Sequence, residues 1–126
     1  EAEKYYLKAA EQDYLDSQYN LGVLYEGKKE YEKAKKWYLK AAEKGGVRSE
    51  NNLGVVYSKE KNYKEAEKWY LKASKDGNIK AQYNLGNLYV EKKEYGKAKE
   101  WYSKASALGH NGASEELKKL ENGEEK

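Results

Sequence analysis

The sequence has no cysteine, proline, methionine or phenylalanine, and only one histidine, His110. Without cysteine, neither a disulfide nor a thiolate metal site can form. Without proline, no helix is forced to break. Without methionine there is no initiator residue, so we expect a fragment or a processed form of a longer chain.

Long apolar runs and blocks of like charge are also missing. No apolar stretch approaches the roughly 20 residues that a bilayer-spanning helix needs, so we expect no membrane insertion and a soluble protein, cytoplasmic or exported. The 25 Lys and Arg and 22 Asp and Glu residues, net +3, alternate along the chain. Such alternation is typical of solvated helix surfaces. It lacks the basic stripe of a nucleic-acid binder, so we expect no nucleic-acid partner.

Aromatic residues are abundant for so polar a chain: 14 Tyr and 3 Trp in 126 residues, of which 37% are charged. Disordered chains are poor in aromatic residues, so this composition indicates a folded core. The length corresponds to one domain.

The chain repeats itself every 32 residues without a gap. The interval separates Trp37, Trp69 and Trp101. The same interval links other residues: Leu21-Gly22, Leu53-Gly54 and Leu85-Gly86; Tyr25, Tyr57 and Tyr89; Ala34, Ala66 and Ala98. A fixed period of this length is typical of repeat architectures.

Each repeat contains two amphipathic patterns of helical spacing, one around Leu21 and Tyr25 and one around Ala34 and Trp37. The short stretch "GKKE" between them predicts an antiparallel helical hairpin. Glycines at 45, 77 and 109 predict left-handed ends for the second helices. Neither helix hides its apolar stripe alone, but stacked hairpins do, as in a solenoid.

We therefore expect an all-α helical-repeat solenoid of about three and a half helix–turn–helix units, forming a single domain. Its parts are a lone second-type helix (1–15), three hairpins (16–46, 47–78 and 79–110), and a closing helix with a polar tail (111–126). In the closing helix, Lys118 replaces the repeated glycine and Glu121 the repeated tyrosine, as expected of a cap.

The segment "LGVLYEGKKEYEKAKKWYLKA" resembles a tetratricopeptide repeat, and "WYLKAAEKG" is similar to SEL-one-like repeats. The aromatic that usually precedes Leu-Gly is replaced by Gln18, Glu50 and Gln82. The resemblance implies a right-handed solenoid that serves as a protein-binding scaffold or adaptor, with the first helices lining a concave groove.

Positions 32 residues apart form a column, and a column that holds the same residue in every repeat indicates structural packing more than a binding site. The Trp column therefore predicts core packing more than an external stacking ladder. Glycine inside a helix costs about 0.5–1 kcal/mol against alanine. Its recurrence at 22, 54 and 86 predicts close approach of Tyr38, Tyr70 and Tyr102.

Partner recognition is expected where the copies differ. The resemblance implies a groove that binds a peptide or partner segment through the first helices: Tyr19, Asn20, Val23, Arg48, Asn51, Asn52, Val55, Lys80, Tyr83, Asn84 and Asn87. Asparagine amides both donate and accept, which suits an extended backbone, although hydrogen bonding within the solenoid explains this column equally well. Arg48 and Lys80 predict a cationic patch for an acidic group of the partner.

Catalysis finds no support. His110 has no cysteine or second histidine with which to form a metal set. The carboxylates alternate with lysines on outward faces, unlike a general acid–base pair. We expect no enzyme activity, no metal and no cofactor.

An alternative role follows from the first helix, whose Tyr5-Tyr6 face lacks the first helix of its own hairpin. That uncovered edge predicts truncation, or a structural module that self-associates or docks another subunit.

Overall fold

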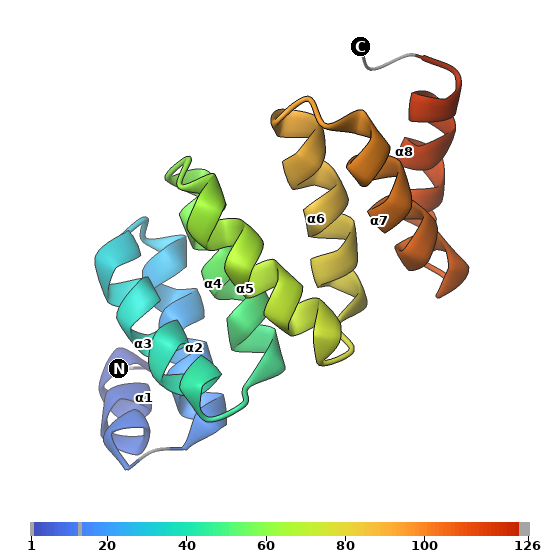
Figure 1. The fold of residues 1–126 in the computed structure, drawn as a ribbon. Coiled ribbons are helices and arrows are strands. Elements are labelled where there is room, and N and C mark those ends of the chain that lie inside the picture. The colour runs from blue at the N-terminus through green and yellow to red at the C-terminus, as the bar shows by residue number, and fades with distance from the viewer. Residues whose placement is uncertain (1, 13, 124–126) are drawn as a thin grey trace. The chain divides into compact units, whose positions relative to one another are not determined.

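The computed structural model describes residues 2–12 and 14–123, and these form helices joined by short turns, with no strand among them (Figure 1). The helices are α1 (Ala2–Glu11), α2 (Leu15–Gly27), α3 (Tyr31–Glu43), α4 (Val47–Lys59), α5 (Tyr63–Lys75), α6 (Ile79–Glu91), α7 (Tyr95–Ala107) and α8 (Asn111–Glu121). Each segment expected from the period contains a helix or a pair of helices.

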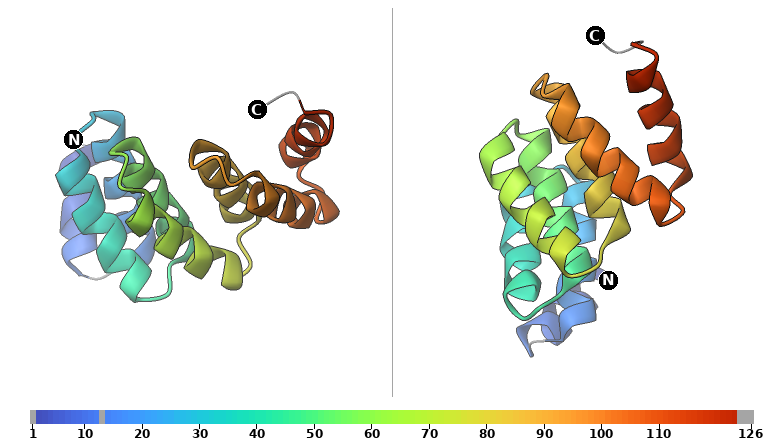
Figure 2. Two further views of the ribbon diagram at one scale, coloured as in Figure 1. Left: turned by 45° about the horizontal axis from the view of Figure 1, so that its top comes forward. Right: turned by 45° about the vertical axis from the view of Figure 1, so that its right-hand side comes forward.

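The chain divides into two compact units, Glu1–Trp69 and Tyr70–Lys126, with the division inside α5. In the first unit, α1 packs on α2, α2 on α3 and α3 on α4, while α2 also contacts α4. In the second unit, α7 packs against both α6 and α8, and α6 also contacts α8 (Figure 2). Each unit therefore repeats one scheme, in which consecutive helices pack together and neighbouring first helices touch.

The apolar stripes form the cores that the periodicity predicts. In the first unit one cluster gathers the buried side chains of successive repeats: Ala10, Leu21, Tyr25, Ala34, Trp37, Tyr38, Ala42, Leu53, Val56 and Trp69. The Trp column belongs to this core at Trp37 and Trp69, which are 5% and 8% exposed. Trp101 in the second unit is only half-buried, and the Lys104 Nζ lies 4.1 Å from its ring centroid.

The repeated glycine of the first helix lies beneath a tyrosine of the second helix. A Cβ added at Gly22 would overlap the ring of Tyr38, and one added at Gly86 would overlap the ring of Tyr102. Both rings are almost completely buried. The expected glycine–tyrosine contact is thus confirmed in both units, and it sets how closely α2 approaches α3 and α6 approaches α7.

The two kinds of turn use different residues. After the second helices, Gly45, Gly77 and Gly109 adopt positive φ, as predicted. After the first helices, lysines take that conformation: Lys29, Lys61 and Lys93, at φ of 61°, 62° and 60°. A left-handed lysine costs roughly 1–2 kcal/mol. The hairpin turn is therefore held by the packing of its helices more than by its own residues.

Candidate functional site

The first helices of neighbouring repeats present a shared face in the first unit, where α2 touches α4. Tyr19 is at the centre of this face, half-buried, with the guanidinium of Arg48 4.2 Å from its ring centroid. Val23, one turn further along α2, is 43% exposed. The structure therefore brings Tyr19, Val23 and Arg48 together on one surface, which we call the α2/α4 face.

Two hollows meet at Tyr19 on this face. The smaller has a volume of about 190 Å³ and is walled by Leu15, Asp16, Tyr19, Ala41, Gly46, Val47, Arg48 and Ser49. Most of these walls are apolar, and the charges of Asp16 and Arg48 extend into solvent. A buried cavity of about 150 Å³ is enough for benzene, so the hollow accommodates one branched or aromatic side chain.

The larger hollow has a volume of about 340 Å³ and is lined by Tyr19, Val23, Glu26, Gly27, Tyr38, Asn52 and Lys59. Its floor carries a hydrogen-bond relay. The Tyr38 hydroxyl donates to Glu26 at 2.7 Å and accepts from the Asn52 amide at 3.3 Å. Burial first, and then the bond to Glu26, raise the pKa of Tyr38, so its hydroxyl stays a donor. Asn52 is thus engaged within the solenoid by a hydrogen bond to the preceding repeat, as one interpretation of its column anticipated.

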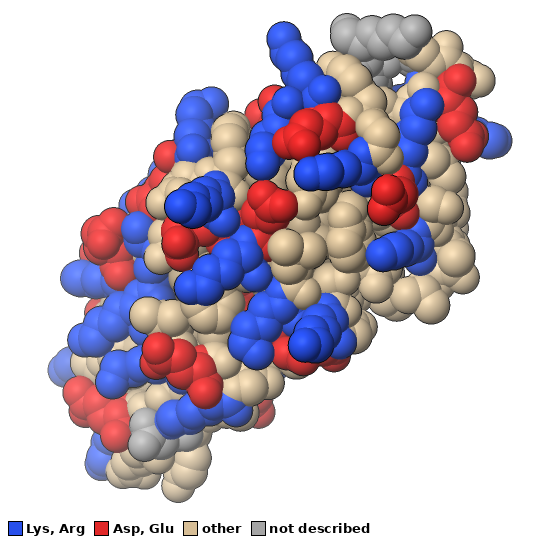
Figure 3. All heavy atoms as spheres, in the orientation of Figure 1, with Lys and Arg blue, Asp and Glu red and all other residues tan. Residues whose placement is uncertain are grey.

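Each hollow contains one acid paired with one base. Arg48 Nη2 lies 3.4 Å from Asp16 Oδ1, and Lys59 Nζ lies 2.8 Å from Glu26 Oε2. The Asp16–Arg48 pair is highly exposed, and such pairs contribute only about 0–1 kcal/mol. Arg48 therefore has an internal partner, but one that an incoming carboxylate can displace. Acidic and basic side chains are likewise interspersed on the surface in Figure 3.

Other groove residues of the first unit differ in accessibility. Asn20 and Val55 are half-buried, whereas Asn51 is only 5% exposed. Asn51 therefore offers almost no surface to a partner, although it occupies the register of Tyr19.

The second unit carries the remaining expected groove residues on α6. Lys80 is exposed, and Tyr83, Asn84 and Asn87 are half-buried. The Tyr83 ring stacks on His110, with centroids 4.4 Å apart and planes inclined by 20°.

Two residues near the α6 face, Tyr102 and His110, form hydrogen bonds that the sequence did not predict. The Tyr102 hydroxyl donates to Asn87 Oδ1. The His110 Nδ1 accepts from the Ala113 amide at 3.0 Å and so caps α8. The sequence signal for Tyr102 is its register with Tyr38; His110 has none, because glycine and asparagine occupy its register at 46 and 78.

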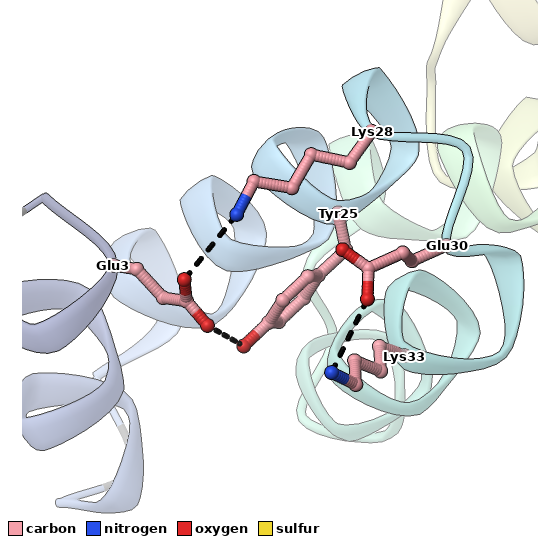
Figure 4. A network of polar contacts seen from close by, with 5 residues as sticks. All are labelled: Glu3, Tyr25, Lys28, Glu30 and Lys33. Atoms are coloured by element: carbon pink, nitrogen blue, oxygen red, sulfur yellow. Dashed lines mark hydrogen bonds and ion pairs between the residues drawn. The ribbon is translucent and has the colours of Figure 1, made fainter.

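A separate polar network links α1 to α2 and the following turn (Figure 4). The Tyr25 hydroxyl donates to Glu3 Oε2 at 2.7 Å, and Lys28 Nζ lies 3.3 Å from Glu3 Oε1. The bond from Tyr25 and the charge of Lys28 lower the pKa of Glu3, while the same carboxylate raises the pKa of Tyr25 to about 12. Lys33 pairs with Glu30 and lies over the Tyr25 ring. The network fastens α1 to its neighbour.

The outer face of α1 is open, as the sequence predicts. Tyr5 is 72% exposed, whereas Trp37, at its register position on α3, is 5% exposed. A hollow of about 330 Å³ lies against Tyr5, Lys8, Ala9, Gln12 and Tyr14. We call this surface the α1 edge.

Two further properties concern only the part of the chain that the structure describes. Within residues 2–12 and 14–123, no three or more His, Cys, Asp and Glu side chains gather in a way that could hold a metal ion. Over the same residues, no helix has both the length and the apolarity that crossing a membrane requires.

The architecture and its repeated contacts define an all-α helical-repeat protein of the solenoid class. The chain is built of Sel1 and tetratricopeptide repeats: the Sel1 repeat family matches residues 1–14 and 15–46, and the tetratricopeptide repeat family matches residues 48–75 and 79–108. Both repeats generally serve as scaffolds for protein–protein interaction. No curated protein sequence matches the chain.

Solved structures agree with this assignment. The chain is 34% identical, with a TM-score of 0.82, to c5321, a protective antigen of uropathogenic Escherichia coli with an SLR fold; the match covers 98% of this chain and 29% of that one. It is 33% identical, with a TM-score of 0.76, to a Sel1 repeat protein from Oxalobacter formigenes, covering 91% of this chain and 52% of that one. The chain thus spans at most about half of either relative.

A third structure is YrrB, described as a tetratricopeptide repeat protein with an unusual peptide-binding site. It is 27% identical, with a TM-score of 0.72, and the match covers 82% of this chain and 57% of that one.

Proposed function

We propose that the protein is a non-catalytic scaffold or adaptor that binds a peptide or partner segment through its first helices. The observation that carries this proposal is the pair of hollows that meet at Tyr19 on the α2/α4 face. An extended segment lying across the face places one side chain in each hollow and passes over the Tyr19 ring. The peptide-binding site described for YrrB supports a peptide as the kind of ligand.

The chemistry of the hollows specifies the segment. The apolar walls of the smaller hollow suit an aliphatic or aromatic side chain. In the larger hollow, Asn52 and Lys59 suit a side chain that forms hydrogen bonds. An acidic group of the partner replaces Asp16 on Arg48, whose planar guanidinium favours bidentate carboxylate binding. Asn20 and Val55 complete the proposed contact surface, to which Asn51 adds little.

The α6 face is proposed as a second contact region, considered by itself. Lys80 offers an exposed cation there, and Tyr83, Asn84 and Asn87 are partly accessible. The stack on His110 holds the Tyr83 ring in one orientation. Binding an acidic segment on this face would depend on Lys80.

The test begins with peptides selected from a displayed random library against the whole chain. Their affinity is then measured by isothermal titration for Val23→Lys and for Arg48→Glu with Lys80→Glu. We expect losses of at least roughly tenfold, because a lysine fills the larger hollow and the carboxylate loses its partner.

Matched controls keep exposure and charge change constant. Leu39→Lys on α3 changes an aliphatic side chain that is 36% exposed, close to Val23. Lys64→Glu on α5 with Lys99→Glu on α7 reverses two exposed charges, as many as Arg48→Glu with Lys80→Glu. Selected peptides that bind every folded variant equally would refute the α2/α4 face, and equal losses in the controls would do the same.

The α1 edge favours a second candidate function, self-association with a second copy, edge against edge. Its exposed Tyr5 and Tyr14, 72% and 59%, are apolar surface suited to a dimer contact. Head-to-tail packing, with α1 of one copy against α8 of another, is disfavoured. Tyr6 occupies the register of Tyr38, whose ring lies over Gly22 of α2. In α8 the register of Gly22 is taken by Lys118, which leaves no room for the Tyr6 ring. Edge-to-edge contact avoids that overlap.

Sedimentation velocity over a wide range of concentration tests this second candidate. We expect a dimer of the unsubstituted chain that Tyr5→Glu with Tyr14→Glu abolishes. Leu108→Glu is the control, since Leu108 is a 58% exposed apolar residue away from the edge. A monomer at all concentrations would exclude self-association through the edge.

A further inference from the structure

At two junctions between successive repeats in the first unit, an ion pair joins the second helix of one repeat to the end of the first helix of the next. Where α1 packs on α2, Lys28 Nζ lies 3.3 Å from Glu3 Oε1. Where α3 packs on α4, Lys35 Nζ lies 2.7 Å from Glu60 Oε1. In both, the second helix of one repeat contributes a residue near its start, and the first helix of the next contributes its C-cap residue.

The two pairs occupy identical register positions with opposite polarity. Residues 3 and 35 are one period apart, as are residues 28 and 60, yet the acid lies on the second helix at the first junction and on the first helix at the second junction. In the sequence, the next positions are Glu67 and Lys92, which return to the first polarity. The charge therefore alternates while the apolar columns stay constant.

The constant columns alone do not choose a neighbour. The same Leu-Gly positions recur in α2, α4 and α6, and the same Ala and Trp-Tyr positions recur in α3, α5 and α7, so these apolar residues do not distinguish one neighbour from another. Repeat proteins characteristically misassemble in this way, by wrong pairing or exchange of elements between chains. An ordered stack needs a feature that differs between adjacent junctions.

The ion pairs are placed where they can supply that feature. The side chains of Lys35 and Glu60 are only 18% and 29% exposed, and Lys35 Nζ also lies 5.0 Å from the Tyr57 ring centroid. Glu3 accepts the Tyr25 hydroxyl as well as Lys28. The Lys35–Glu60 pair is thus partly desolvated beside an aromatic ring, where charges interact more strongly than on the open surface. The side chains of Glu3 and Lys28 are more open, at 40% and 49% exposed.

We propose that the alternating charges select which hairpin stacks on which, and reject a slip of one repeat. Native stacking joins opposite charges at both junctions. A one-repeat slip sets Glu3 against Glu60, and by the register of the sequence Lys35 against Lys92. Like charges suppress wrong partners in interfaces. The α1 surface therefore accepts a hairpin whose first helix ends in a cation and refuses one whose first helix ends in an acid.

The test removes the alternation while keeping opposite charges together at the first junction. Glu3→Lys with Lys28→Glu gives the first junction the polarity of the second. We expect a several-fold larger fraction of domain-swapped dimer after rapid refolding at high protein concentration, measured by size-exclusion chromatography with light scattering. Adding Lys35→Glu, Glu60→Lys, Glu67→Lys and Lys92→Glu restores the alternation and should return the dimer fraction to that of the unsubstituted chain.

A double-mutant cycle keeps the proposal testable if those variants refold poorly. Lys35→Glu and Glu60→Lys each place like charges together and should lower the folding equilibrium constant about three- to tenfold. The double substitution should recover a large part of that loss, but not all of it, because Lys35 also pairs with Glu32. Any one of three results overturns the proposal. The dimer fraction of the two-residue reversal equals that of the unsubstituted chain, or the dimer fraction of the six-residue reversal equals that of the two-residue reversal. The third is that the free-energy changes of Lys35→Glu and Glu60→Lys add in the double variant.

Discussion

The α2/α3 hairpin matches the Sel1 repeat family and the α6/α7 hairpin matches the tetratricopeptide family, yet both are built around the same contact. In each, a glycine of the first helix lies under a tyrosine ring of the second, Gly22 under Tyr38 and Gly86 under Tyr102. The neighbouring aromatic is also placed alike, since Tyr19–Tyr38 and Tyr83–Tyr102 centroids lie 6.1 and 5.9 Å apart. The apolar geometry is therefore independent of the family that matches.

The polar surroundings of that contact do differ. The Tyr38 hydroxyl donates to Glu26, whereas Tyr102 donates to Asn87, which occupies the register of Val23. The register of Glu26 in α6 is Val90. The acceptor has thus moved by three residues, about one helical turn, and still reaches the hydroxyl. The contact between glycine and tyrosine determines how the hairpin packs. The acceptor for the tyrosine hydroxyl can come from either of two successive turns of the first helix.

The largest effect should come from breaking the shared contact. Gly22→Ala and Gly86→Ala each force a methyl group into a buried ring, and overpacking of this kind costs typically 1–3 kcal/mol, so we expect about 3 kcal/mol for each. Urea unfolding followed by circular dichroism measures the loss. Gly96→Ala is the control, because nothing lies within 4 Å of its Cβ position. It should gain about 0.5–1 kcal/mol.

Removing the tyrosine hydroxyl should destabilise the α2/α3 hairpin more than the α6/α7 hairpin. Tyr38→Phe loses a bond to a carboxylate, worth about 1.5–3 kcal/mol, and Tyr102→Phe loses a neutral bond, worth about 0.5–1.5 kcal/mol. Urea unfolding should therefore show the larger loss for Tyr38→Phe.

The acceptors can also be exchanged. Asn87→Val with Val90→Glu gives α6 the arrangement of α2, after which Tyr102→Phe should cost as much as Tyr38→Phe. Equal losses before the exchange would contradict the assigned partners.

His110, which stacks on Tyr83, should contribute more to stability than Arg48, which stacks on Tyr19. His110→Ala removes a helix cap as well as the stack on Tyr83, so we expect about 1–2 kcal/mol of destabilisation. Arg48→Ala removes only an exposed stack and ion pair, so we expect under about 1 kcal/mol. Thermal unfolding compares them. His110→Asn should retain the cap, since Asn78 accepts from the Ala81 amide in the same way at α6; a full loss in that variant would argue against capping.

The smallest effect concerns ionisation of Tyr25 in the first unit. Because Glu3 raises the pKa of Tyr25 to about 12, its stabilising bond is intact below the ordinary value near pH 10 and is lost as pH rises through about 12. At pH 11 the absorbance at 295 nm should increase in Glu3→Gln relative to the unsubstituted chain, by less than one full phenolate because burial still raises the pKa of Tyr25. Superimposable titration curves would show that the carboxylate does not control Tyr25.

Periodicity was enough to predict most of the fold. The 32-residue interval predicted the helices, the α2/α3 and α6/α7 hairpins, the left-handed glycines and the tyrosines over Gly22 and Gly86, because repeated residues must occupy repeated environments. The left-handed lysines at 29, 61 and 93 were not predicted, since lysine has no intrinsic preference for that conformation. The division within α5 gave no signal either, because the period continues through Trp69 unchanged.

The candidate site was less predictable, because it depends on side-chain rotamers and on which partner each polar group selects. Arg48 was expected as a cation for a partner, but the structure also pairs it with Asp16, its own register position one repeat earlier. Asn51 was expected in the groove, yet it is buried where Tyr19 is not. Registers identify which positions share a face, whereas exposure depends on the size of the individual side chain.

The one-per-repeat tryptophan, described above as core packing, makes the protein its own fluorescence reporter. Trp37 and Trp69 are in the interior of the first unit, and Trp101 is a half-buried residue of the second. Variants that retain a single indole would therefore report emission from one hairpin at a time. Their melting curves would distinguish a chain that unfolds in one step from one whose repeats separate in turn, the behaviour that nearest-neighbour stacking allows.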